Sequence, residues 1–115
     1  MTLSTHVLDA TTGRPAEGVP VVVERREADL WAQLGRGITG PDGRLDGRQG
    51  DWLPAGEPGP GVYRITFGSG GYFAERGVAA FYPEIAVCFE VSSPGEHYHV
   101  PLLLSPFAYS TYRGS

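Results

Sequence analysis

Short apolar stretches, each closed by a turn sequence, set the strongest limit on what this chain can fold into. β-Branched and aromatic side chains dominate these stretches, which alternate or run together over strand-like lengths. Turn sequences such as Gly40-Pro41-Asp42-Gly43 separate them, and the 115 residues include 17 Gly and 10 Pro. Strands at this spacing favour an antiparallel β-sandwich of seven to eight strands. The predicted strands are residues 3–8, 19–25, 30–39, 61–67, 84–91, 98–104 and 107–112.

One segment has helical character, and it lies between two predicted strands. Residues 72–76 follow Ser69, a candidate N-cap, and end at Gly77, a candidate C-cap. Residues 46–60 are rich in Gly and Pro and predict a long irregular loop. The length allows one domain, and we expect residues 1–115 to form it.

The charge balance excludes some classes of function. Nine basic against thirteen acidic residues give a net charge of −4, so the chain lacks the basic field that non-specific nucleic-acid binding needs. No apolar run is long enough to span a membrane, and we see no secretory signal. The single cysteine, Cys88, sits in an apolar run and is predicted to be buried and unpaired. These features favour a cytoplasmic protein without a nucleic-acid or membrane partner.

Strand alternation puts two histidines on faces that point away from the core. His6 shares a face with Ser4 and Leu8, and His99 shares one with Leu103. An ordinary solvent face would be charged, so we interpret these half-apolar faces as a subunit interface or a ligand groove. In the last strand, Ser110 and Tyr112 share a face. The residues predicted to face the core are Leu3, Thr5 and Val7 in the first strand, and Tyr98, Val100, Leu102 and Leu104 in the strand over 98–104.

Histidine and arginine are the side chains here that could carry chemistry. Histidine titrates near neutral pH and can take a proton from water, although a lone histidine is more often an ordinary surface residue. Arg44 follows a tight turn, and its guanidinium suits oxygens that gain negative charge. His97 and His99 lie on one side of a strand, a zinc-like spacing, but no Cys or carboxylate partner stands beside them. Nucleophile-elbow, phosphate-loop and dinucleotide motifs are absent.

Three stretches together resemble one family. They are Leu3-Ser4-Thr5-His6-Val7-Leu8-Asp9 with Gly13 and Pro15-Ala16, then Asp42-Gly43-Arg44, and then His97-Tyr98-His99-Val100-Pro101-Leu102-Leu103 running through Ser105-Pro106 to Tyr112-Arg113-Gly114-Ser115. This pattern is similar to that of the transthyretin-related proteins, the 5-hydroxyisourate hydrolases of urate breakdown. The likeness extends over essentially the whole chain, and the terminal Tyr-Arg-Gly-Ser is its most specific part.

The resemblance implies a transthyretin-like all-β sandwich that assembles as a homotetramer, a dimer of dimers, with active sites in a channel between dimers. It implies hydrolysis of 5-hydroxyisourate by water, with no cofactor and no metal. The catalytic residues of the family fall on His6, Arg44 and His99. Which histidine acts as the base stays open, as does the role of a terminal carboxylate near the site. The resemblance also implies that the substrate is bound by Tyr112, Ser115 and Ser110.

Two other functions remain open from the sequence. A carrier of small aromatic ligands would use the same tetramer channel, as hormone-carrying transthyretin does. A purely structural sandwich module is the third alternative. A passive channel has no need of His6, His99 and Arg44, and a structural module predicts an ordinary charged face around His6. The sequence therefore favours the hydrolase.

Overall fold

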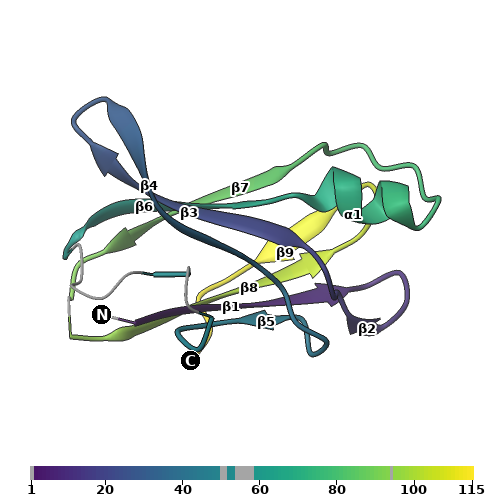
Figure 1. Ribbon diagram of the computed structural model, residues 1–115, viewed down its shortest axis with the longest axis horizontal. Helices are drawn as coiled ribbons and strands as arrows, with labels where there is room; N and C mark the ends of the chain where they lie inside the picture. The colour runs from purple at the N-terminus through teal and green to yellow at the C-terminus, as the bar shows by residue number, and fades with distance from the viewer. Residues whose placement is uncertain (1, 50–51, 54–58, 94) are drawn as a thin grey trace.

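The computed structural model describes residues 2–49, 52–53, 59–93 and 95–115, and it shows two β-sheets that face each other (Figure 1). One sheet has the strand order β2-β1-β8-β9, with β5 also paired to β1. The other has the order β4-β3-β6-β7. The first sheet consists of β1 (Thr2–Asp9), β2 (Arg14–Pro15), β5 (Arg44–Leu45), β8 (His97–Leu104) and β9 (Tyr109–Thr111). The second consists of β3 (Pro20–Glu27), β4 (Leu30–Ile38), β6 (Gly61–Phe67) and β7 (Ile85–Val91).

The predicted all-β sandwich is confirmed, and each of the seven predicted strands is present with its ends shifted by a few residues. The two additional strands, β2 and β5, have two residues each, too few to give an alternating pattern in the sequence. The pairing of β1 with β8 is parallel, whereas we predicted an antiparallel sandwich. Alternation fixes which face a side chain occupies but carries no information about strand direction, so this pairing could not be predicted.

The side-chain alternation predicted for β1 and β8 is confirmed. Buried residues alternate with half-buried ones along β1, and Tyr98, Val100, Leu102 and Leu104 of β8 are buried. The interior between the sheets is apolar and close-packed, which supplies the main favourable free energy of folding. Its largest fully buried side chains are Trp52, Tyr63, Phe67, Phe73, Leu45 and Ile65.

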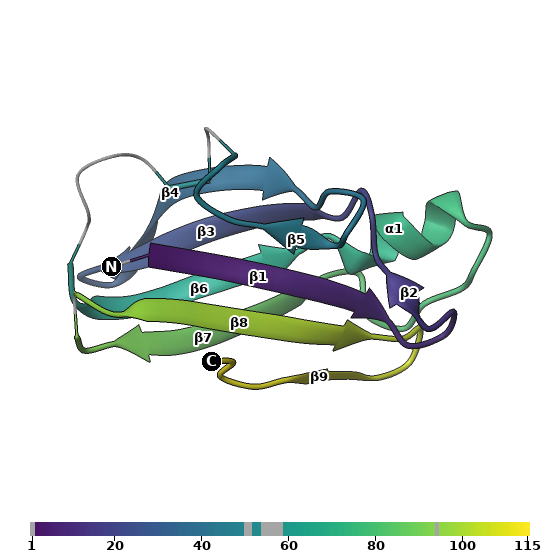
Figure 2. The ribbon, with the colours of Figure 1, turned by 90° about the horizontal axis from the view of Figure 1, so that it is seen from below.

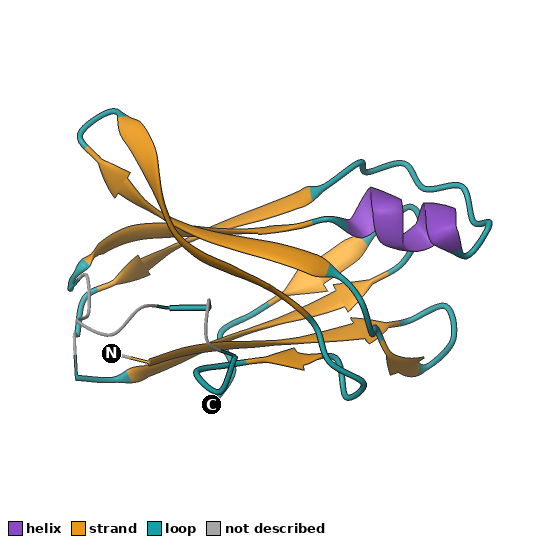
Figure 3. Ribbon diagram, in the orientation of Figure 1, coloured by secondary structure: helices purple, strands orange, loops and turns teal. Residues whose placement is uncertain are grey.

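The short helix α1 (Ser69–Glu75) lies at one end of the sandwich, between β6 and β7 (Figure 3). Its N-cap is Gly68, without a side-chain cap, so the prediction that Ser69 caps the helix is wrong. Ser69 is instead the first helical residue, and it is buried. The C-cap is Arg76, one residue before the predicted Gly77, and Gly77 follows it with φ +70° and donates its N–H to the carbonyl of Ala74. No helix among the described residues is long and apolar enough to cross a bilayer.

Two further sequence predictions have different outcomes. Cys88 is exposed, so the prediction that it is buried is wrong. It lies on β7 at the edge of its sheet, on the strand face opposite the buried Ile85 and Val91. The loop predicted over residues 46–60 lies partly outside the described residues. Its Trp52 is fully buried and donates its indole N–H to the carbonyl of Leu3 at 2.9 Å, which fixes this segment against β1.

Candidate active site

The candidate site lies on the outer face of the sheet that contains β1 and β8, which is the face toward the viewer in Figure 2. In the β1–β8 ladder, Thr2 pairs with His97, Ser4 with His99, and His6 with Pro101. Paired residues point to the same side of a sheet, and the alternate residues of each strand share that side. The register therefore gathers the three histidines on one outer face.

A tight turn brings Arg44 to the same face. Gly43 has φ +76°, donates its N–H to the carbonyl of Gly40 at 2.8 Å, and accepts the N–H of Val7 at 2.8 Å. The Asp42 carboxylate accepts the backbone N–H of Arg44 at 3.0 Å. A side chain at position 43 would collide with the backbone of β1, so only glycine allows this approach.

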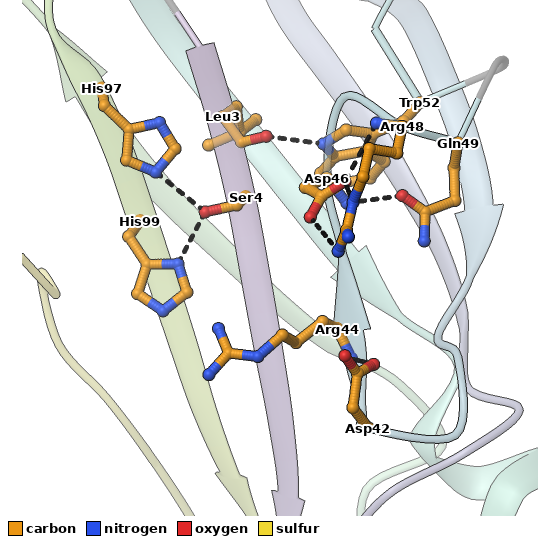
Figure 4. Close-up of polar contacts among 10 residues, drawn as sticks. All are labelled: Leu3, Ser4, Asp42, Arg44, Asp46, Arg48, Gln49, Trp52, His97 and His99. Carbon is orange, nitrogen blue, oxygen red and sulfur yellow. Dashed lines mark hydrogen bonds and ion pairs between the residues drawn. The ribbon is translucent and has the colours of Figure 1, made fainter.

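The turn pairs Arg44 with His6 in the β1–β5 ladder. Its guanidinium extends across β1 toward His99 (Figure 4). Among the residues that the structure describes, none forms an ion pair with this exposed guanidinium. The charge is therefore available to an external anion or to an oxygen that gains negative charge.

Burial and the charges on this outer face change the pKa of His99. Burial lowers the pKa of this imidazole, and the neighbouring charges of Arg44, His97 and His6 lower it further. The neutral form of His99, which can accept a proton, is consequently favoured at neutral pH. No three His, Cys, Asp or Glu side chains are grouped for metal binding in the described part of the chain.

The end of the chain packs on His99. Gly114 donates its N–H to the carbonyl of His99 at 2.8 Å and pairs with it in an isolated bridge. A Cβ on Gly114 would lie only 2.5 Å from Cδ2 of the His99 ring, so the backbone and the ring are in close contact. Tyr112 lines a cavity together with His99, and Ser115 is the next residue after Gly114.

Ser110 is not part of this cluster within one chain. It pairs with Leu103, four positions along β8 from His99, which at about 3.3 Å per residue places it about 13 Å away along the strand. The structure therefore brings His6, Arg44 and His99 together on one face, and it brings Gly114 of the Tyr-Arg-Gly-Ser stretch against His99. Ser110 stays a prediction that needs a second chain or a large ligand.

Comparison with known proteins gives one consistent family. Residues 3–114 match the HIUase/Transthyretin family. The chain is 50% identical to a 5-hydroxyisourate hydrolase of Salmonella dublin, an alignment that covers 98% of this chain and 80% of that protein. It is 42% identical to the mouse 5-hydroxyisourate hydrolase, over 98% of this chain and 94% of that one.

This chain belongs to the HIUase/transthyretin family.

Similar solved structures include a 5-hydroxyisourate hydrolase and a thyroxine-bound transthyretin. A Klebsiella pneumoniae 5-hydroxyisourate hydrolase superposes with a TM-score of 0.84 at 35% identity, and the match covers 100% of both chains. Sea bream transthyretin in complex with thyroxine superposes with a TM-score of 0.88 at 32% identity, over 97% of this chain and 93% of that one. The backbone thus fits both kinds of protein, and the side chains of the site must distinguish them.

Two side chains on this outer face, His97 and Ser4, were not among the site residues predicted from the sequence. We treated His97 as an ordinary surface histidine, yet it stacks beside His99 with ring centroids 6.4 Å apart. Ser4 bridges the two rings, with its Oγ 3.0 Å from His97 Nε2 and 2.7 Å from His99 Nδ1. Alternation had already put Ser4 beside His6, but the bridge depends on the parallel register of β1 and β8.

Proposed function

We propose that this protein hydrolyses 5-hydroxyisourate to 2-oxo-4-hydroxy-4-carboxy-5-ureidoimidazoline in urate degradation. The observation that carries the proposal is the gathering of His6, His99 and the exposed Arg44 on one outer face. A carrier of neutral or apolar ligands has no use for a lowered histidine pKa beside an exposed guanidinium. The names of the 40–50% identical hydrolases support the same substrate.

Neutral His99 acts as the base in this proposal, with His6 holding the attacking water. General base catalysis of this type contributes about 10²–10⁴-fold to a rate. The lowered pKa of His99 keeps the ring unprotonated near neutral pH, so the ring can take a proton from water as it attacks. His6 lies two residue pairs further along the β1–β8 ladder, opposite Pro101, and shares the face.

Arg44 binds the oxygens of the substrate and stabilises the charge that develops on the ring carbonyl. The water oxygen forms a bond to the carbonyl carbon, and the electron pair of the C=O bond moves onto oxygen. When the carbonyl re-forms, the ring C–N bond breaks and the leaving nitrogen takes a proton. The product carboxylic acid then ionises and forms an ion pair with the guanidinium.

We further propose that Tyr112, Ser115 and Ser110 bind the heterocycle. Gly114 donates its N–H to the His99 carbonyl and contacts the His99 ring, which supports a role for the terminal Tyr-Arg-Gly-Ser in shaping the site. Ser110 lies farther along the same sheet, opposite Leu103. A homotetramer, a dimer of dimers, would close this open outer face into a channel and bring such distant residues to one substrate.

We propose a cytoplasmic location. The support is chemical, because Cys88 is an exposed unpaired thiol, and such thiols persist in reducing compartments.

The rival function is ligand carriage, which the likeness to thyroxine-bound sea bream transthyretin favours. The two functions separate when freshly generated 5-hydroxyisourate is followed by its ultraviolet absorbance. The hydrolase accelerates the decay, whereas a carrier leaves the uncatalysed rate unchanged. Alanine at His6, His99 or Arg44 is expected to lower kcat/KM by at least 10²-fold while the chain stays folded.

The matched control for the arginine variant is Arg36→Ala, which removes an exposed arginine from β4 in the opposite sheet. It is expected to keep the rate of the unaltered protein. Unchanged decay with the unaltered protein would refute the proposed function, and normal rates in all three alanine variants would refute the assignment of the site.

A further inference from the structure

The hydroxyl of Ser4 joins two imidazoles into a continuous hydrogen-bonded chain. Ser4 Oγ lies 2.7 Å from His99 Nδ1 and 3.0 Å from His97 Nε2 (Figure 4). Thr2 Oγ1 contacts His97 Nδ1. The parallel register puts Ser4 opposite His99 and Thr2 opposite His97, so the four groups lie in a row along one face. This hydrogen-bonded chain of side chains runs from the half-buried His99 to the exposed His97.

The arrangement constrains the tautomer of His99. A neutral imidazole has one N–H and one lone pair, and only the nitrogen with the lone pair can act as a base. The Nδ1 atom of His99 is engaged with Ser4, so Nε2 is the nitrogen left to face water and substrate. Nε2 can be the base only when the Nδ1–H donates to Ser4. The hydroxyl of Ser4 then donates to His97 Nε2, and the His97 Nδ1–H donates to Thr2.

We propose that Ser4 and His97 form a proton relay for His99, with Ser4 also fixing the His99 tautomer. Both are positioning residues, since neither touches the reacting atoms. This inference rests on the proposed hydrolase function, and it concerns where the proton taken from water goes. It adds two residues to the machinery, neither of which strand alternation alone would select.

The proton transfers of this relay cancel over one turnover. When His99 Nε2 takes a proton from the attacking water, the Nδ1 proton moves to Ser4 Oγ and the Ser4 hydroxyl proton moves to His97 Nε2. His97 then carries the positive charge, and His99 is neutral with its proton on Nε2. When His99 gives that proton to the leaving nitrogen, both transfers reverse and restore the starting state.

The surroundings favour the charge on His97. An imidazolium at His99 would be partly buried and would face Arg44 and His6, both of which disfavour it. His97 is exposed, and Asp46 lines the same small cavity beside it. Water therefore solvates an imidazolium at the exposed His97 more readily than one at the half-buried His99.

The tautomer is tested directly by ¹⁵N NMR of histidine-labelled protein at neutral pH. The expected result is a His99 ring protonated at Nδ1, and in Ser4→Ala a mixture of tautomers. A His99 ring protonated at Nε2 in the unaltered protein would overturn the proposal whatever the rates.

The relay is tested by kinetics on four variants. Ser4→Ala is expected to lower kcat at least tenfold with little change in KM, and Ser4→Thr, which keeps the hydroxyl, is expected to recover most of the loss. His97→Gln keeps an acceptor for Ser4 but cannot take the proton, so kcat is expected to fall. Added imidazole is expected to restore part of the activity of His97→Ala. Ser92→Ala, which removes an exposed hydroxyl outside this hydrogen-bonded chain, is the control.

The acid limb of the rate profile gives a readout that a structural role would not move. His97 is one of the charges that lower the pKa of His99, so His97→Gln is expected to shift that limb to higher pH. Normal kcat and an unshifted profile in Ser4→Ala and His97→Gln, with an active unaltered protein, would refute the relay alone. An unaltered protein that does not accelerate the decay of 5-hydroxyisourate would refute the proposed function instead.

Discussion

Replacing Gly114 with alanine should disable the site without unfolding the protein. The new Cβ would lie 2.5 Å from Cδ2 of the His99 ring, against the 3.4 Å at which ordinary van der Waals contact begins. The ring or the terminal backbone must therefore move by about 0.9 Å. The hydrogen bond from the Gly114 N–H to the His99 carbonyl holds the backbone, so we expect the ring to yield. A displacement of about 1 Å in a catalytic group can cost about 10²-fold in rate.

The assay is kcat for 5-hydroxyisourate decay, paired with thermal unfolding. Gly114→Ala is expected to lower kcat by about 10²-fold and to leave the unfolding temperature nearly unchanged, because Gly114 lies outside the apolar core between the sheets. Gly71→Ala is the matched control, since nothing lies within 4 Å of its added Cβ, and alanine in helix α1 should stabilise by about 0.5–1 kcal/mol. If Gly114→Ala and Gly71→Ala have the same kcat, the claim that the contact between Gly114 and the His99 imidazole matters for catalysis is refuted.

Three further results are expected. Burial and the charge of Arg44 lower the pKa of His99 below its ordinary 6.5, so the acid limb of kcat/KM should be centred below pH 6.5; an acid limb centred above 6.5 would contradict this. Tyr72→Phe removes the 2.8 Å hydrogen bond to the buried Asp9 carboxylate and should cost about 1–3 kcal/mol in chemical denaturation, whereas an unchanged midpoint would contradict that role. Thr39→Val leaves two buried backbone groups without the hydroxyl and should cost about 1–3 kcal/mol for each, while Thr39→Ser should cost less.

The sequence was sufficient to assign the sandwich and the faces of its strands. Alternation needs only the polarity of successive side chains, so it correctly put Val7 in the core and His6 and His99 on the outer face. The prediction that Cys88 is buried was wrong, because apolar neighbours in an edge strand do not show which face of the strand is covered. Ser69 failed as an N-cap because the helix begins one residue earlier than that role requires.

The pairing and register of the strands could not be predicted from the sequence. The bridge from Ser4 to His97 and His99 needs the parallel register, which pairs residues 95 positions apart in the chain. Alternation alone treats His97 as one more exposed histidine, and it gives no sign that Gly114 contacts His99. These contacts are set by the tertiary pairing of β1 with β8 and of β8 with the chain end, for which no local signal exists.

The most direct test of the site formed by His6, Arg44 and His99 is a crystal structure of the protein with a non-hydrolysable analogue of the oxidised purine. The account predicts the analogue on the outer face of β1 and β8, with its carbonyl oxygens within hydrogen-bond distance of the Arg44 guanidinium and an ordered water between it and His99 Nε2. An analogue bound elsewhere, with Arg44 and His99 both out of contact, would contradict it.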